Sequence, residues 1–137
     1  MFKHEKMLFH PVGVERPNPQ YAALLQEQLG GANGELKAAM QYMSQSFRIQ
    51  DPEIKDLFLD IAAEELGHME MVAAIVHQLT RNLSDEDVRN NSAFAPYFVD
   101  HTTGVYPTAA SGFPWTAGSI QSTGDVIADL TEDLAAE

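Results

Sequence analysis

The stretch LFLDIAAEELGHMEMVAAIVHQL, residues 57–79, decides the fold of this chain. Apolar residues recur in it, and just before it, at alternating intervals of four and three, which places them on one face of an α-helix. Six of the eight positions on this face are large and apolar, and a glutamate and a histidine occupy the other two. The eight are Ile54, Phe58, Ile61, Glu65, His68, Val72, Ile75 and Leu79. A carboxylate and an imidazole are costly to bury unless a ligand binds them, so the pattern predicts that Glu65 and His68 hold a metal ion.

The composition narrows the classes of protein to consider. The 137 residues, 45% of them hydrophobic, suffice for one domain with a substantial core, which we expect to span residues 1–137. The net charge of −12 argues against nucleic acid or an anionic membrane as a partner, because both are negatively charged. The absence of cysteine excludes disulfides, thiolate metal sites and cysteine nucleophiles. The sequence has no apolar run of transmembrane length and no signal-peptide core in residues 1–10, so we expect a cytoplasmic protein.

An earlier helix is predicted to pair with the one just described. Residues 1–18 read as an extended arm, and a helix over residues 19–48 begins at Pro19, which suits a first-turn position. Gly30, Gly31 and Gly34 lie in the middle of this helix and weaken it by roughly 1 kcal/mol each relative to alanine. Three glycines within one turn therefore indicate close packing or a local distortion.

The second helix is predicted over residues 51–81. Asp51 is a good N-cap and Pro52 a good first helical residue. A short joint between two long helices predicts an antiparallel hairpin.

The remainder of the chain is predicted to cross over the bundle and end in a helix. A crossover is predicted over residues 84–122, and Ser84 before three acidic residues predicts a short helical turn at its start. Residues 91–122 hold most of the remaining prolines and glycines without a sustained period, which indicates a long irregular segment. A last helix over residues 123–137 continues the four-and-three pattern with three apolar residues, and Glu137 is the next position on that face. The three are Ile127, Leu130 and Leu134. Three aspartates of the same helix are expected on its exposed face, and they are Asp125, Asp129 and Asp133.

Three helices thus each offer a carboxylate on or beside an apolar face. These are Glu35, Glu65 and Glu137, and the second helix adds His68 three residues after Glu65. A Glu-x-x-His pair with lone glutamates from neighbouring helices is typical of dinuclear carboxylate sites in ferritin-like bundles. Manganese and iron favour several oxygen donors with one imidazole per metal, and a bridging carboxylate holds two such ions about 3.5–4 Å apart. The sequence therefore predicts an all-α, ferritin-like four-helix bundle of which three bundle helices are present.

Two further groups of residues have simpler alternative interpretations. Tyr42 is either a core tyrosine or a hydrogen-bond donor that orients the metal ligands. Asp56 and Asp60, four residues apart, are either a solvated helix face or a peripheral cation site.

The chain resembles the manganese catalases, including the related spore-coat proteins that share their fold. The resemblance covers essentially all 137 residues. Its motifs are MFKHEK at the start, GGANGE before Glu35, EELGHMEM around Glu65 and His68, GFPWTAGSIQSTGD, and ADLTEDLAAE at the end. It implies a di-manganese site in a four-helix bundle that disproportionates hydrogen peroxide to water and oxygen.

The resemblance also implies roles for individual residues. Glu65 corresponds to the bridging carboxylate, and Glu35 and His68 correspond to terminal ligands of one manganese. Glu137 corresponds to a ligand of the other manganese. Tyr42 resembles the tyrosine that orients the ligands, so we expect Glu65 and Tyr42 to take part in catalysis.

Asp56 and Asp60 resemble carboxylates that hold a structural calcium in some members of the family, and close relatives form hexamers. Family members are longer than this chain, and their fourth bundle helix carries the second histidine ligand. We therefore expect this chain to be the N-terminal part of a longer protein. Two alternatives remain: a non-catalytic spore-coat or metal-binding structural protein of the same fold, and iron oxidation in the manner of ferritins. A second histidine helix and evolution of oxygen from peroxide would distinguish the catalase from the first alternative, and iron dependence of the activity would favour the second.

Overall fold

The computed structural model describes residues 3–91 and 104–137, and this part of the chain is all-α, as predicted. Thr108 and Pro114 form an isolated antiparallel β-bridge outside the helices. The helices are α1 (Pro19–Gly30), α2 (Glu35–Ser46), α3 (Pro52–Leu79), α4 (Asp85–Arg89) and α6 (Val126–Ala136), with a 3-10 turn η1 (Ala117–Ser119). No helix among the described residues is long and apolar enough to cross a membrane.

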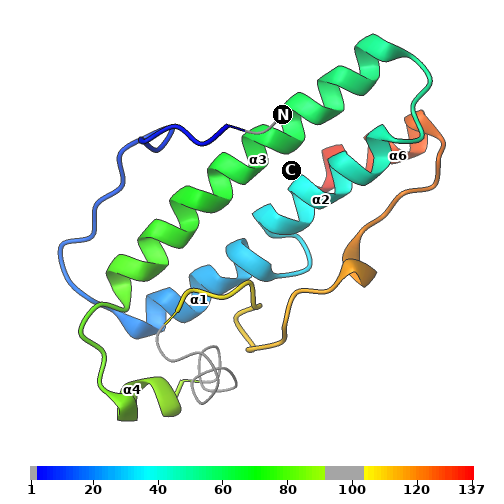
Figure 1. The fold of residues 1–137 in the computed structure, drawn as a ribbon. Helices are drawn as coiled ribbons and strands as arrows, with labels where there is room; N and C mark the ends of the chain where they lie inside the picture. The colour runs from blue at the N-terminus through cyan, green and yellow to red at the C-terminus, as the bar shows by residue number, and fades with distance from the viewer. Residues whose placement is uncertain (1–2, 92–103) are drawn as a thin grey trace.

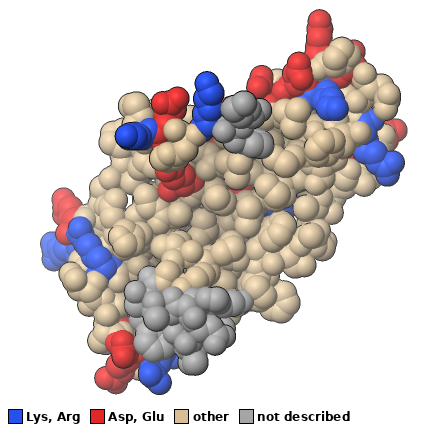
Figure 2. All heavy atoms as spheres, viewed as in Figure 1, with Lys and Arg blue, Asp and Glu red and all other residues tan. Residues whose placement is uncertain are grey.

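Helix α3 is the long central element against which the others are arranged. Helices α1 and α2 follow one another along one side of it, and α6 packs on α2 (Figure 1). The N-terminal arm packs on α3 as well, because the amide of Val14 donates to Gln78 Oε1 over 2.9 Å. On the face shown in Figure 2, the charged side chains lie mostly toward the edges of the molecule.

The single helix predicted over residues 19–48 is instead two helices, α1 and α2, separated by residues 31–34. The glycines explain this difference, since the crossover segment packs directly on Gly30. A Cβ atom on Gly30 would overlap the backbone of Pro107 and Thr108. A Cβ atom on Gly34 would come within 2.7 Å of the Gln28 carbonyl oxygen. Close packing and local distortion therefore occur together at this break.

Helices α2 and α3 form the predicted antiparallel hairpin. Asp51 caps α3, because its side chain accepts hydrogen bonds from the amides of Glu53 and Ile54. Phe58 on α3 is fully buried and lies edge-on to Tyr42 of α2, with ring centroids 5.7 Å apart. Ile49 and Ala62 join Tyr42 and Phe58 in one buried cluster, which reaches along α3 to within one turn of Glu65.

Helix α6 faces the bundle with the opposite side from the one predicted. Ile127 and Leu134, expected to be buried, are 77% and 78% exposed, and Leu130 is 37% exposed. Asp129 and Asp133, expected on the exposed face, are 4% and 3% exposed. Asp125 is exposed, and it caps α6 by accepting from the amides of residues 127 and 128.

Hydrogen bonds to glutamines explain why the aspartate face turns inward. Asp133 Oδ1 accepts from Gln41 Nε2 at 2.7 Å and from Gln45 Nε2 at 3.0 Å. Gln45 Nε2 also donates to the carbonyl oxygen of Gln121, and the amide of Gln121 donates to Gln41 Oε1. This polar network joins α2, α6 and the crossover, and it satisfies buried groups that an apolar contact would leave without partners.

The predicted crossover over residues 84–122 contains α4 and η1, and its residues 92–103 lie outside the described part. Gln26 of α1 fixes the segment after them, since its Nε2 donates to the carbonyl oxygen of Tyr106 and to Thr108 Oγ1. The crossover therefore lies against α1 before it reaches α6 (Figure 1).

Candidate metal centre

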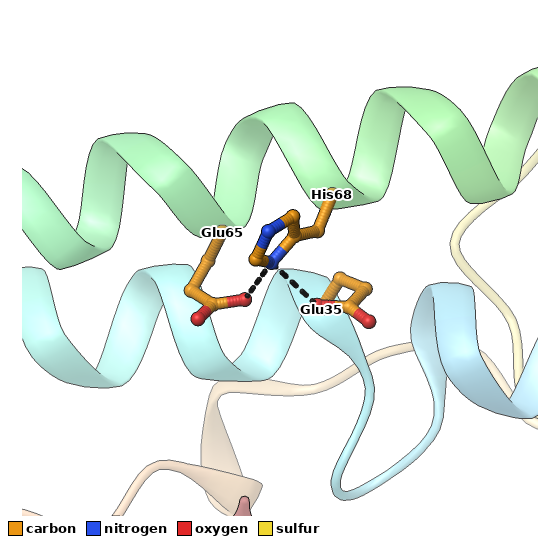
Figure 3. Close-up of side chains that lie close together, drawn as sticks. All are labelled: Glu35, Glu65 and His68. Carbon is orange, nitrogen blue, oxygen red and sulfur yellow. Dashed lines mark hydrogen bonds and ion pairs between the residues drawn. The ribbon is translucent and has the colours of Figure 1, made fainter. Parts of the chain in front are cut away.

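Three of the predicted metal ligands converge from two helices. Glu35 is the first residue of α2, and Glu65 and His68 lie one turn apart on α3 (Figure 3). His68 Nδ1 is 2.9 Å from Glu65 Oε2 and 3.8 Å from Glu35 Oε2. One potential ligand atom from each residue lies within 4.8 Å of the others. Glu65 is buried, as the apolar pattern of its helix face predicted.

The charges in this cluster hold protons on the ligand groups when no metal is bound. Burial, the adjacent Glu65 carboxyl group and the charge of Glu137 raise the pKa of Glu35 from 4.5 to about 7, against the opposing charge of His68. Burial alone would lower the pKa of His68, but its hydrogen bond to Glu65 and the neighbouring carboxylates outweigh burial and raise it. A bound cation would displace these protons and relieve the repulsion between the carboxylates.

Tyr42 links this cluster to the fourth predicted ligand, Glu137. The Tyr42 hydroxyl donates a hydrogen bond to Glu137 Oε1 over 3.2 Å. Burial, the charges of Asp133 and Glu137 and this hydrogen bond raise the pKa of Tyr42 well above its usual value. Tyr42 therefore stays neutral and remains a donor. Glu137 is not one of the three clustered donors, but it lines one cavity together with Glu35 and Glu65.

A cavity of about 270 Å³ lies between α2, α3 and α6. Its walls include Glu35, Glu65 and Glu137, together with Lys37, which the sequence did not single out, and Asp133, which was expected on an exposed face. A signal for them was present, because polar side chains recur at intervals of four on α2, at Lys37, Gln41 and Gln45. A polar stripe of this kind on a buried helix indicates a polar partner such as Asp133.

The N-terminal arm covers the outer side of His68, which the sequence also did not predict. The Phe9 ring lies edge-on to the His68 ring, with centroids 6.2 Å apart. A Cβ atom on Gly67 would overlap Phe9, so the glycine makes room for this ring. A second hollow, between the arm and α3, lies next to this contact.

Asp56 and Asp60, the predicted calcium site, are exposed on α3. Neither belongs to the metal-binding group of Glu35, Glu65 and His68. The calcium site therefore stays a prediction.

Known proteins resemble this chain along its whole length. The family described as manganese containing catalase matches residues 1–137. A probable manganese catalase of Clostridium acetobutylicum is 52% identical and covers the whole chain, which spans 61% of that protein. Protein CotJC of Bacillus subtilis is 44% identical, and the chain spans 71% of it.

The fold matches as well as the sequence does. The crystal structure of KatB, a manganese catalase from Anabaena, is 39% identical and superimposes with a TM-score of 0.87 over 99% of this chain and 60% of that one. The chain thus spans about 60% of two of these relatives and belongs to the manganese-containing catalase family.

Proposed function

We propose that this protein disproportionates hydrogen peroxide to water and oxygen at a dinuclear manganese site. The observation that carries the proposal is the convergence of Glu35, Glu65 and His68 within 4.8 Å in a chain of this family. The function also rests on Glu137, which approaches the same cavity from α6. The chain spans 61% of the probable manganese catalase of Clostridium acetobutylicum. In this proposal, the ligands that complete the dinuclear site come from the part of such a protein that this chain does not span.

The donor set suits manganese. Carboxylate oxygens with one imidazole nitrogen match the preferences of a divalent manganese ion better than those of softer metals. Glu65 would be shared by the two ions, because it contacts His68 and also lines the cavity that Glu137 lines. Glu35 and His68 would then hold one ion and Glu137 the other.

The chain supplies orientation and shielding for the reaction. Bound manganese would supply the two-electron redox chemistry that reduces one peroxide and oxidises the next. In the metal-free protein the 2.9 Å contact between Glu65 and His68 Nδ1 holds the imidazole in an orientation that faces the carboxylates. Tyr42 donates to Glu137 and so orients that carboxylate toward the cavity. The buried ring of Phe58 packs edge-on against the Tyr42 ring and so restricts its movement.

The proposal is tested by loading the purified protein with manganese and measuring oxygen release from peroxide with an oxygen electrode. Glu65→Gln should lower the bound manganese and abolish oxygen release, because an amide is a poor bridging ligand. Glu64→Gln is the matched control, since Glu64 is the exposed neighbour and should leave manganese content and activity unchanged. Manganese binding without oxygen release would overturn the catalase proposal and support the non-catalytic metal-binding alternative.

A further inference from the structure

Lys37 is a nearly buried residue whose charge is used neither by the hydrogen bonds of the described part of the chain nor by the proposed reaction. The residue is 2% exposed, and its Nζ atom is not one of the fully buried polar atoms without a partner, so the ammonium group reaches the surface of the cavity that Lys37 lines. The ion pairs among the described residues involve His4 and His68, and none of them reaches Lys37. No hydrogen bond from its ammonium group occurs in that part either. An ammonium group on a nearly buried residue is unfavourable without a hydrogen-bond partner, so a partner molecule in the cavity is expected.

The position of Lys37 shows where such a partner would lie. Lys37 lines the cavity that also contains Glu35 and Glu65. On α2 it lies four residues before Gln41, on the face that meets α6, whereas Glu35 and Tyr42 are seven residues apart on the face that meets α3. The cavity therefore has a side formed by metal-ligating carboxylates and a side formed by the ammonium group.

Asp133 provides an independent observation on the same cavity. It is 3% exposed, and its Oδ1 already accepts two hydrogen bonds, from Gln41 and Gln45. Its Oδ2 is buried and has no hydrogen-bond partner among the described residues. An ammonium donor at Lys37 and a buried acceptor at Asp133 thus both line one cavity, and neither has a partner among residues 3–91 and 104–137.

We propose that the Lys37 ammonium group binds a small, electron-rich molecule beside the metal centre, and that this molecule is the peroxide substrate. Hydrogen peroxide can accept a hydrogen bond from Lys37 through one oxygen and donate one through an O–H group to a carboxylate such as that of Asp133. A cavity of about 270 Å³ has room for several molecules of this size. The identity of the ligand as peroxide rests on the proposed function, whereas the binding role of Lys37 does not.

Azide, a small anion, is the probe for this site in the manganese-loaded protein. Isothermal titration calorimetry should show that Lys37→Met weakens azide binding about tenfold, because a charge-assisted hydrogen bond is lost. Lys37→Arg should keep the affinity within about threefold, since the charge remains. Lys6→Met is the matched control: Lys6 is exposed in the arm and outside the cavity, and its replacement should change nothing. Lys37→Gln, which keeps a polar side chain without the charge, should weaken azide binding in the same way if the methionine variant does not fold.

Steady-state kinetics separate a binding role from a structural one. Lys37→Met should raise the KM for peroxide more than it lowers kcat, at unchanged manganese content. Unchanged azide affinity and unchanged KM in an oxygen-evolving enzyme would overturn the role of Lys37 while the catalase proposal stands. Weakened azide binding in a protein that evolves no oxygen would support the Lys37 site and overturn the catalase proposal instead.

Discussion

Replacing Asp133 by alanine should destabilise the metal-free chain by about 2–4 kcal/mol. This free-energy change is the sum of the losses at the two hydrogen bonds that Asp133 accepts. Gln41 Nε2 would lose its acceptor inside the protein, and an unsatisfied buried donor costs about 1–3 kcal/mol. Gln45 Nε2 keeps the Gln121 carbonyl oxygen as a second acceptor, so its loss is nearer the net value of one hydrogen bond, about 1 kcal/mol.

Urea denaturation followed by circular dichroism measures this difference, and two variants make it specific. Asp133→Asn keeps an acceptor oxygen for both glutamines and should cost about 1 kcal/mol or less. Leu134→Ala should change the free energy of unfolding by less than about 0.5 kcal/mol, because Leu134 is 78% exposed. A larger loss for Leu134→Ala than for Asp133→Ala would refute the orientation of α6 and restore the face predicted from its apolar pattern.

Three other predictions concern packing, protonation and the arm. Gly30→Ala should cost about 1–3 kcal/mol in urea denaturation, because the new Cβ atom overlaps the Pro107 backbone. Glu35, with its pKa raised from 4.5 to about 7, stabilises the metal-free fold below pH 4.5, and this stabilisation is lost as the pH rises through 7. Urea denaturation at several pH values should show the free energy of unfolding fall between pH 4.5 and 7. The Glu35→Gln variant should lack this fall, because its side chain does not titrate. Phe9→Ala should weaken manganese binding about 2- to 10-fold in a calorimetric titration, because His68 loses an aromatic contact, whereas Phe9→Leu should lose less.

The hairpin and three of the site residues were predictable from the sequence because their signals are local. The four-and-three spacing in α3 requires only that one helix face be buried, and Glu65 and His68 interrupt that face visibly. Asp51 and Pro52 mark the start of α3 in the same local way. Glu35 could be placed with them because a short joint determines how α2 lies against α3.

The orientation of α6 was not predictable, because it depends on partners distant in the sequence. The apolar spacing of Ile127, Leu130 and Leu134 is a genuine helical pattern, but the polar stripe of α2 determines which face turns inward. Gln41 and Gln45 need an acceptor, and Asp133 is the acceptor that α6 offers. The break between α1 and α2 also depends on a distant element, since Gly30 is in contact with Pro107. The sequence indicated a distortion at the glycines and could not indicate which segment would pack on them.

The polar network between α2 and α6 has a consequence for the order of folding. The hydrogen bond from Gln41 to Asp133 closes a loop of 92 residues, whereas Glu35, Glu65 and His68 all belong to one hairpin. Contacts of low contact order form earlier, because less chain entropy is lost in closing them. Three carboxylate and imidazole donors should therefore be assembled before α6 brings Glu137. Pulse-labelling hydrogen exchange during refolding should then show amide protection in α2 and α3 before α6. In the proposed function these three donors bind manganese, so manganese present during refolding should accelerate the formation of the hairpin.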